Sequence, residues 1–406
     1  MLVKAVSFLL KDPLPSEAVF LLKDFRLAIN QAIRVGIEKG VSSRNAFNRI
    51  AYKDFRIRHP GMYSNHITSA FEVASGILKN YRRRLKEGTR QPTPYARRLM
   101  MKSESRVYKL DRENGIIELR IRAGCRVNLG LVVSQYHRKY LDNESLSLGS
   151  LTVFPDRVHI CFKREAPKPY KPKAALVLDT NESSLDGIFV KARRKKVIPV
   201  IADFSDIRGI QQRHFERRGR FHKKKYHDRR TVKRLCAKEG RREHNRVEYR
   251  LHQVADAVLD FAEKNQSAVI IEDLKGIKPK KGKTFNRRIC SWPRRKLHMI
   301  MEYKAQWRGI PLVKVDPRNS SRTCPICGNI PKSRIGKEFK CKCGWRMDRH
   351  INASINLLQT AISKKVVGGL RFSPGAFQHD VMMTLYDPIM GARSELNGMS
   401  HKGVTA

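Results

Sequence analysis

Acidic residues are scarce in this chain of 406 residues, which holds 37 Asp and Glu against 84 Lys and Arg. The formal net charge of +47 would make the chain repel itself strongly unless a polyanion neutralised it. A nucleic acid is therefore the expected partner. Ribosomal and chromatin proteins share this property, so the charge predicts a class of partner but no activity.

Long apolar runs are also missing. No stretch approaches the roughly 18 apolar residues that a membrane-spanning helix needs, so we expect no membrane partner. The first residues, MLVKAVSFLLKDPLPSEAV, are too few and too polar for a signal peptide. These two absences predict a cytoplasmic protein.

Cysteine is infrequent, and half of it is concentrated in one segment. Four of the eight cysteines are scattered along the chain, which favours a reducing compartment over a disulfide framework. The other four are Cys324, Cys327, Cys341 and Cys343. They form two short knuckles joined by a basic loop. Four thiolates complete the coordination of a tetrahedral Zn²⁺, so we expect a structural zinc ribbon over about residues 318–347.

The hydrophobic period changes twice in the N-terminal part of the chain. Residues 1–13 alternate as a strand, residues 16–85 have helical spacing, and residues 97–165 form short alternating segments between polar turns. We expect a β-barrel or sandwich over residues 1–165, with a helical insertion at about residues 14–90.

Residues 166–173, rich in Pro and Lys, predict a linker and a domain boundary. From residue 174 the expected order is three close antiparallel strands, helix, strand, helix, strand and helix. That order is typical of an RNase H-like domain, in which helices flank a mixed sheet, and we expect it over residues 174–363. The helical part after Phe204 is strongly basic and should lie along a phosphate backbone. Residues 364–406 show no sustained period and predict a loose C-terminal tail.

Acidic side chains stand at the expected ends of two strands of this domain. Asp179 ends the first strand, Glu272 ends an apolar run typical of a buried parallel strand, and residues 348–352 begin the last helix. Ligands at the carboxyl ends of adjacent strands can meet although they are far apart in the sequence. Carboxylates that share two divalent cations promote phosphodiester hydrolysis, and Mg²⁺ prefers such oxygen ligands. We expect the nearby Asp186 to lie in a hairpin turn rather than to bind metal.

Three motifs carry a resemblance to a known family: AVIIEDLKGI, LHMIMEYKAQWRGIPLVKVDPRNSSRTCPICG and CKCGWRMDRHINASINLL. They resemble TnpB (OrfB), the transposon-encoded ancestors of the type V CRISPR effector nucleases, most specifically over about residues 245–360. The resemblance implies a prokaryotic RNA-guided DNA endonuclease whose RuvC nuclease domain carries the zinc ribbon as an insertion. It also implies that the N-terminal β-barrel and its helical insertion hold a guide RNA and read a short motif beside the double-stranded DNA target. Asp179 and Glu272 match the first two acids of the family, which bind Mg²⁺ or Mn²⁺.

The third acid is where the chain departs from the family pattern. The family shows Asp-Arg-Asp before x-Asn-Ala, whereas this chain reads MDRHINAS and has His350 at the position of the metal-binding acid. Imidazole is a poor ligand for Mg²⁺, although softer divalent ions accept it. Asp348 lies two residues earlier. It could substitute only from a turn ahead of the helix, because two helical positions point about 200° apart.

Three hypotheses follow from these observations. The first is an RNA-guided DNA nuclease in which Asp179 and Glu272 hold divalent metal, helped by Asp348 or His350. The second is an RNA-guided DNA-binding protein whose nuclease is impaired because His350 replaces the third acid. The third is a zinc-ribbon RNA-binding protein without guided activity, which explains the charge and the cysteines but not the acids at the strand ends.

Overall fold

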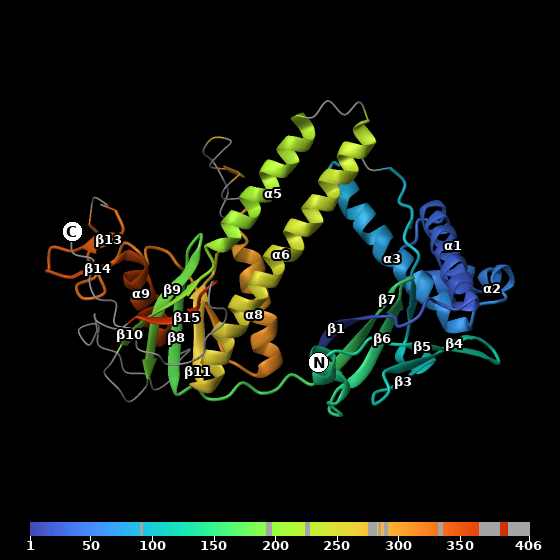
Figure 1. Ribbon diagram of the computed structural model, residues 1–406, viewed down its shortest axis with the longest axis horizontal. Coiled ribbons are helices and arrows are strands. Elements are labelled where there is room, and N and C mark those ends of the chain that lie inside the picture. Colours follow the sequence, from blue (N-terminus) through green and yellow to red (C-terminus); the bar gives the residue numbers. More distant parts are fainter. Residues whose placement is uncertain are drawn as a thin grey trace. The chain divides into compact units, whose positions relative to one another are not determined.

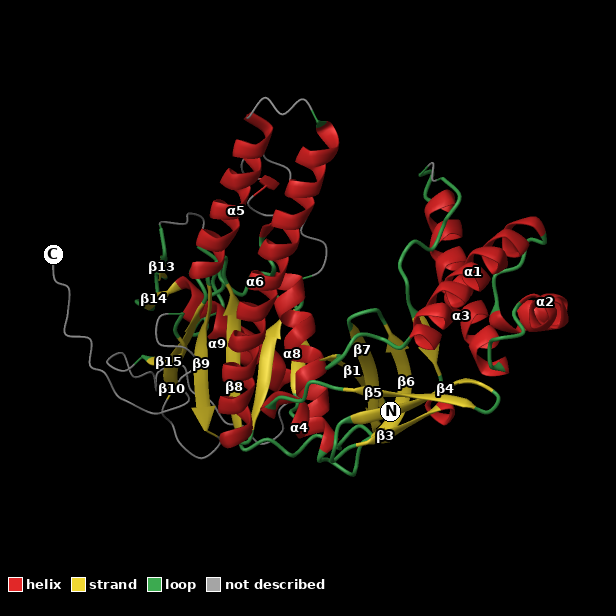
Figure 2. Cartoon of the chain, turned by 45° about the vertical axis from the view of Figure 1, so that its right-hand side comes forward, coloured by secondary structure: helices red, strands yellow, loops and turns green. Residues whose placement is uncertain are grey.

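The computed structural model describes residues 1–89, 92–191, 197–223, 228–274, 282, 286–287, 291–331, 336–364 and 382–388. The chain divides into two compact units, Met1–Glu165 and Ala166–Ala406 (Figure 1). Both units combine helices with sheets, as the colours of Figure 2 show. None of the helices in these described residues has the length and apolar character that crossing a membrane requires.

Three helices of the first unit pack around aromatic side chains. They are α1 (Ser16–Glu38), α2 (Arg44–Arg58) and α3 (Ser64–Lys86). Each buries an apolar stripe, and Phe71 lies in ring contact with both Phe47 and Phe55. Gly36 lets α1 approach α3 closely, because a Cβ at this position would overlap the Leu78 side chain. The helical spacing expected for this part of the chain is confirmed.

The strands of the first unit form two hydrogen-bonded sheets. The first sheet has the order β1 (Leu2–Leu9), β7 (Arg157–Arg164), β6 (Ser147–Val153) and β2 (Met101–Ser103). The second consists of β3 (Tyr108–Asp111), β4 (Ile116–Arg122) and β5 (Cys125–Gly130). A bridge between Leu10 and Leu131 links the end of β1 to the end of β5, and α4 (Gln135–Leu141) follows. Closure of these sheets into a barrel stays a prediction.

The second unit is built on a six-stranded mixed sheet. Its strand order is β12 (Leu312–Val315), β11 (Ser267–Glu272), β8 (Ala174–Thr180), β9 (Ser184–Lys191), β10 (Val197–Asp203) and β15 (Met383–Tyr386). β9 pairs antiparallel with both β8 and β10, whereas β11 pairs parallel with both β8 and β12. The expected antiparallel strands, the expected buried parallel strand and the α+β class are confirmed.

Helices cover both faces of this sheet, which explains why β8 and β11 are buried along their whole length. α6 (Arg229–Lys264) and α8 (Arg294–Arg308) supply the core on one face, to which Leu178 belongs. α9 (Arg349–Ser363) supplies the core on the other face, to which Val177 belongs. Side chains of one strand therefore alternate between two apolar cores.

The C-terminal segment contributes a strand that the sequence pattern does not predict. Met383–Tyr386 (β15) pairs parallel with β10, and Tyr386 is fully buried. The expectation of a loose tail over residues 364–406 is therefore wrong for this strand. Four residues are too short a window for a period to be recognised, so only the pairing with β10 reveals the strand. Residues 365–381 and 389–406 lie outside the described residues.

Candidate functional site

Side chains from three neighbouring strands meet at one edge of the six-stranded sheet. Asp179 lies near the end of β8, Glu272 ends β11, and Asp186 lies in β9 directly opposite Asp179. Each acid lies two residues from a member of the core beneath α9, so all three point to that face of the sheet. His350, in the first turn of α9, contacts Asp179. Asp179 and Glu272 therefore meet although they are far apart in the sequence.

Asp179 and Glu272 are two buried carboxyl groups in contact with each other. Their side chains are hydrogen-bonded, and Glu272 Oε1 accepts a second hydrogen bond of 2.8 Å from the backbone N–H of Thr180. Burial raises the pKa of both carboxyl groups, and the contact with Asp179 raises that of Glu272 further. Two carboxylates this close repel each other when both are charged, so they share a proton unless a cation lies between them.

His350 lies beside this pair, at the position where the resemblance predicts an acid. Its Nδ1 lies 2.6 Å from Asp179 Oδ2, and its side chain is 18% exposed. Burial lowers the pKa of His350, so the neutral imidazole is favoured at neutral pH. With the proton on Nδ1, the ring donates to Asp179 and presents Nε2 as an acceptor.

Asp348 lies ahead of the helix, at the end of the short strand β14 (Arg346–Asp348). It is the N-cap of α9: its Oδ1 accepts hydrogen bonds of 2.8 Å from His350 N and 3.3 Å from Ile351 N. The residue is exposed, whereas Asp179 and Glu272 are buried. Asp348 therefore orients the start of α9 from outside the buried pair.

Asp186 does not lie in the hairpin turn, where the sequence placed it. The turn is shorter than expected, and Asn181 N donates to Ser184 O across it at 2.9 Å. Asp186 therefore falls inside β9 and pairs with Asp179. The signal that could have found it is the spacing, because a tight turn of four residues after Thr180 brings positions 179 and 186 opposite each other.

The four clustered cysteines lie where a single metal ion could bind all of them. Their Sγ atoms lie within 4.8 Å of one another, and they come from Cys324, Cys327, Cys341 and Cys343. Sγ of the first lies 3.6 Å from Sγ of the last, and the two middle Sγ atoms lie 3.5 Å apart. β13 (Glu338–Lys340) and β14 form the hairpin that carries the second knuckle.

Backbone geometry shapes both knuckles. Gly328 and Gly344 follow them with φ of 72° and 91°, a conformation that favours glycine. Backbone N–H groups point at the sulfur atoms, and the bond from Cys343 lowers the pKa of the Cys341 thiol to about 7. Burial raises the pKa of the Cys324 thiol to about 12. Because metal binding requires thiolates, a bound cation would keep even this buried thiol deprotonated.

Two asparagines of α9 tie the cysteine segment to the sheet. Asn352 is fully buried, and its Nδ2 donates to Thr323 O at 3.0 Å. Asn356 Nδ2 donates to Thr323 O at 2.8 Å and to Ser320 O at 2.7 Å. Trp345 Nε1 donates to Asn352 Oδ1 at 3.1 Å, so one amide contacts the segments on both sides of the ribbon. The Asn-Ala-Ser-x-Asn motif therefore holds the ribbon on the helix that carries His350.

Removing either amide should loosen this attachment. Asn352→Ala removes the acceptor of Trp345 Nε1 and one of the two side-chain hydrogen bonds to Thr323 O, which we expect to cost roughly 1–3 kcal/mol of unfolding free energy. Urea unfolding of the full chain measures the loss. The exposed Gln306→Ala on α8 serves as the control and should change little. An Asn352→Ala variant as stable as this control would contradict the assignment.

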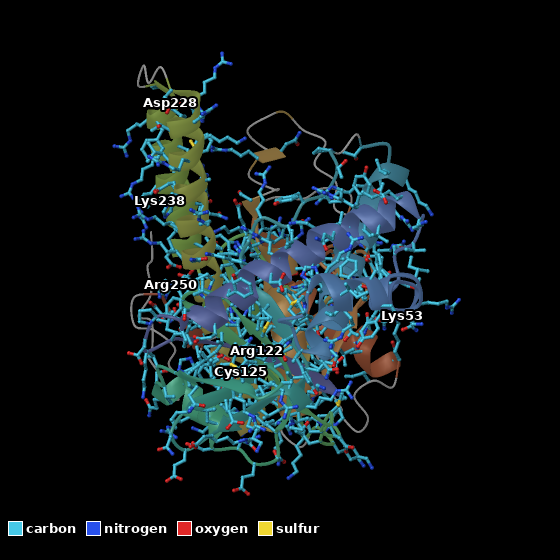
Figure 3. The ribbon with its side chains drawn as sticks, turned by 90° about the vertical axis from the view of Figure 1, so that its right-hand side faces the viewer. Lys53, Arg122, Cys125, Asp228, Lys238 and Arg250 are labelled. Atoms are coloured by element: carbon cyan, nitrogen blue, oxygen red, sulfur yellow. The ribbon has the colours of Figure 1, made fainter. Side chains whose placement is uncertain are left out.

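A long basic hairpin rises from the second unit (Figure 1). It consists of α5 (Asp206–Lys223) and α6, which run side by side. Glu239 is buried between them, where it contacts His214 Nδ1 at 2.7 Å and accepts a hydrogen bond of 3.2 Å from Arg217. Figure 3 shows that side chains of α6, including Lys238, project away from the helix. This half of α6 presents exposed cations rather than an apolar stripe.

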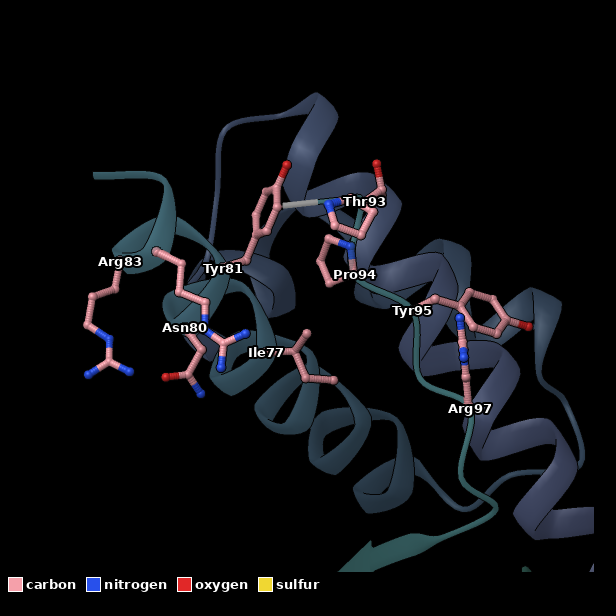
Figure 4. A pocket seen from close by; sticks show the side chains of 10 residues that line it. Ile77, Asn80, Tyr81, Arg83, Thr93, Pro94, Tyr95 and Arg97 are labelled. Carbon is pink, nitrogen blue, oxygen red and sulfur yellow. The ribbon is translucent and has the colours of Figure 1, made fainter. Parts of the chain in front are cut away.

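A cavity of about 720 Å³ lies in the first unit between α3 and the extended segment that follows it (Figure 4). Ile77, Asn80 and Tyr81 line the helical wall, and Pro94 and Tyr95 line the opposite wall. Three arginines also line it: Arg83, Arg84 and Arg97. Aromatic rings beside guanidinium groups form a surface on which a nucleobase can stack.

The chain matches known families in both units. Residues 295–357 match the Cas12f1-like TNB domain, and residues 21–120 match the family of the uncharacterized protein MJ0013. The first match covers α8, the cysteine cluster and the start of α9. The second covers most of α1, all of α2 and α3, and the strands β2, β3 and most of β4.

Individual proteins are similar over larger parts. The TnpB-like protein MJ0751 of Methanocaldococcus jannaschii is 29% identical over 247 residues, which are 57% of this chain and 86% of that protein. The CRISPR-associated endodeoxyribonuclease Cas12f1 of Sulfoacidibacillus thermotolerans is 32% identical over 124 residues, 30% of this chain and 28% of that protein. A solved Cas12f1–sgRNA–target DNA complex shares the fold with a TM-score of 0.58 at 16% identity, covering 84% of this chain and 82% of that chain.

These similarities extend from the helices of the first unit to the cysteine cluster and α9 of the second. The match over residues 295–357 includes the second of the three motifs and nearly all of the third. The similarities therefore support the resemblance of this chain to the TnpB family.

Proposed function

We propose that this chain is an RNA-guided DNA endonuclease of the TnpB type, encoded by a transposable element, which hydrolyses phosphodiester bonds with divalent metal. The meeting of Asp179 and Glu272 at the carboxyl edge of two parallel strands carries the proposal. Relatives named as CRISPR-associated or RNA-guided DNA endonucleases support it. In this proposal the second unit is an RNase H-like (RuvC) domain, and the cysteine ribbon is inserted between β12 and α9.

The donor chemistry at the sheet edge fits Mg²⁺ or Mn²⁺. Asp179 and Glu272 offer hard carboxylate oxygens, and their buried pairing disfavours the doubly charged state without a cation. When bound, such cations supply activation of the attacking water and stabilisation of the departing oxygen. His350 adds a nitrogen donor, which favours divalent ions softer than Mg²⁺.

The chain's own residues orient these ligands. The backbone N–H of Thr180 holds Glu272 by donating to Oε1, and the His350 ring holds Asp179 through its Oδ2. Asp348 caps α9 and so fixes the backbone from which His350 projects. Preorganised ligands of this kind lose little freedom when a cation and a phosphodiester bind.

We further propose that the four cysteines bind a structural Zn²⁺. With Zn–S bonds of about 2.3 Å, the edges of a tetrahedron of sulfur atoms measure about 3.8 Å. The Sγ separations of 3.5 and 3.6 Å are close to this value. The ion would order the ribbon over about residues 318–347. The hydrogen bonds of Asn352 and Asn356 would attach this ordered ribbon to α9.

The proposed partners are a guide RNA and a double-stranded DNA target. The strands and helical insertion of the first unit would hold the guide RNA and read a motif beside the target, with the cavity between α3 and Tyr95 as a stacking surface. The exposed cations of α6 would follow a phosphate backbone. The surfaces proposed for these roles lie outside the hydrophobic cores of both units.

Removing cations from α6 should weaken nucleic-acid binding in a salt-dependent way. The triple variant Lys233→Gln, Lys238→Gln and Arg241→Gln replaces side chains that are exposed. We expect the slope of log K against log salt to fall by about 0.7 for each lost single-strand contact. Fluorescence anisotropy with the copurified RNA measures the slope. Lys264→Gln, at the other end of α6, is the control, and equal slopes for both variants would refute this role of the helix.

One experiment tests the proposed function as a whole. The protein is purified with its own RNA, the RNA is sequenced, and a double-stranded DNA matched to the guide is supplied with Mg²⁺ or Mn²⁺. We expect cleavage of the matched DNA and none of a scrambled DNA. Failure to cut in both metals would sink the endonuclease proposal.

A second candidate function is guided DNA binding without cleavage. The contact of His350 with Asp179 favours it, because the imidazole takes up a carboxylate oxygen that a metal would use. This candidate predicts guided binding in the same experiment but no cutting. It also predicts that His350→Asp would restore some cleavage.

A further inference from the structure

Asp186 places a third carboxylate at the proposed nuclease edge, whereas the family's own third-acid position holds His350. Asp186 and Asp179 are direct partners in the antiparallel pairing of β9 and β8. Opposed residues of such a pair lie on one face, with Cβ atoms about 4.5–5.5 Å apart. On the other side of β8, Ile271 of β11 pairs with Leu178, which sets Glu272 beside Asp179. Asp179 therefore lies between the other two acids.

The surroundings of Asp186 hold it in place and leave part of its carboxylate available. Ser184 Oγ donates to Oδ2 at 2.9 Å, and the Asn181 amide donates to the same oxygen. Among the residues that the structure describes, both of these hydrogen bonds end on Oδ2, so Oδ1 remains for a ligand. Ser354 Oγ of α9 donates to the backbone O of Asp186 at 3.2 Å, which fixes this part of β9 against the helix.

A purely structural role does not explain why position 186 holds an acid, whereas a bound cation does. Like charges directly opposite each other across two strands are destabilising, and burial increases that cost. The two hydrogen bonds to Oδ2 could be accepted equally well by the neutral amide oxygen of an asparagine. An acid at this position is therefore explained by a positive ligand shared with Asp179.

We propose that Asp186 is a metal-binding residue of this chain and supplies the carboxylate that is missing at position 350. The inference rests on the proposed nuclease function and extends it to a residue outside the family pattern. Asp348 is the weaker candidate, because it is exposed and its Oδ1 already caps α9. The position of Asp186 beside Asp179 needs no rearrangement of the helix.

The test measures Mn²⁺ binding to the zinc-loaded full chain, freed of RNA, by electron paramagnetic resonance. Loss of a residue that only orients a metal ligand weakens metal binding by about 10–100-fold, so we expect Asp186→Asn to weaken it at least tenfold. Asp316→Asn is the matched control, since Asp316 follows β12, is exposed and accepts from Arg318 N. Equal affinities for the two variants would overturn the inference, as would a wild-type chain that binds no Mn²⁺.

Two further variants separate metal binding from a structural role. Ser184→Ala removes one of the two hydrogen bonds to Asp186 but keeps its carboxylate and the bond from Asn181, so it should weaken Mn²⁺ binding less than Asp186→Asn does. A loss as large as that of Asp186→Asn would make the role structural and overturn the inference. In a His350→Asp background the effect of Asp186→Asn should shrink, because an acid then stands at the start of α9. An undiminished effect would contradict the replacement.

An assay of guided cleavage distinguishes failure of this inference from failure of the endonuclease proposal on which it rests. Wild-type chain that binds Mn²⁺ but never cuts, with binding lost in Asp186→Asn, would end the endonuclease proposal and support the assignment of Asp186. Normal cleavage and Mn²⁺ binding by Asp186→Asn, with both lost in Asp179→Asn, would overturn the assignment and support the endonuclease.

Discussion

Asp179→Asn and Glu272→Gln should each lower the rate of guided DNA cleavage by at least about 10²–10³-fold, while guided binding of the same DNA persists. Each change removes one carboxylate charge and keeps the shape of the side chain. The lost charge is the one that would hold divalent cations against the phosphodiester. Cleavage and gel-shift assays on one guide and one matched target measure the two effects separately.

The same variants should not destabilise the protein. Burial raises the pKa of both carboxyl groups, and the contact with Asp179 raises that of Glu272 further, so the folded chain disfavours their charged forms. A neutral amide at either position relieves the repulsion between the two carboxylates, and the melting temperature without divalent metal should stay equal or rise. Asp316→Asn is the control and should retain cleavage. An Asp179→Asn variant that cuts at the wild-type rate would exclude Asp179 from the site.

Cys324→Ser should remove the proposed zinc and, with it, the order of the ribbon. Structural Zn²⁺ contributes about 10–16 kcal/mol of binding free energy in zinc-finger peptides, and three remaining thiolates hold it far less tightly. We expect a fall from one zinc per chain to almost none, together with proteolytic cleavage between residues 318 and 347. Metal analysis and limited proteolysis measure the two effects.

Disorder of the ribbon should also disturb the proposed nuclease site, because α9 carries His350. Asn352 and Asn356 bind Thr323 O, so a disordered cysteine segment leaves two buried amides of α9 without partners. Guided cleavage should fall with zinc content as a result. Cys125→Ser, in β5 of the other unit, is the control for the loss of a thiol. Full zinc content in Cys324→Ser would refute the four-thiolate site.

His350 is the position at which this chain departs from the TnpB pattern that it otherwise resembles. The ring contacts Asp179 and its pKa is lowered by burial, so it does not supply a permanent positive charge to the acids around it. A cation that binds at this edge must therefore bring its own charge. In the nuclease proposal the cation displaces the His350 ring from Asp179. In the binding-only proposal the ring excludes the cation.

Much of the architecture could be predicted from local sequence patterns. Alternating apolar residues located β7 and the three antiparallel strands, and a continuous apolar run located β11. The cysteine spacing predicted one cluster, because two short knuckles can close only a small loop around a metal. The expectation that Asp179 and Glu272 meet followed from the position of each acid at a strand end.

Other features depend on contacts that no local pattern contains. β15 is a strand because β10 offers an unpaired edge to it, and its own four residues carry too little periodicity. The role of Asn352 and Asn356 is visible only where α9 lies beside the backbone of residues 320–323. Such hydrogen bonds join residues about 30 positions apart and leave no spacing rule behind.

Asp179 and Asp186 illustrate the difference between what local sequence patterns predict and what only the tertiary structure shows. The sequence by itself determined that Asp179 ends a strand, since the apolar run before it sets its place in the sheet. Only the tertiary structure decided that Asp186 faces it, because the length of one turn sets the register of the whole hairpin. One residue more in that turn would carry every side chain of β9 to the opposite face of the sheet.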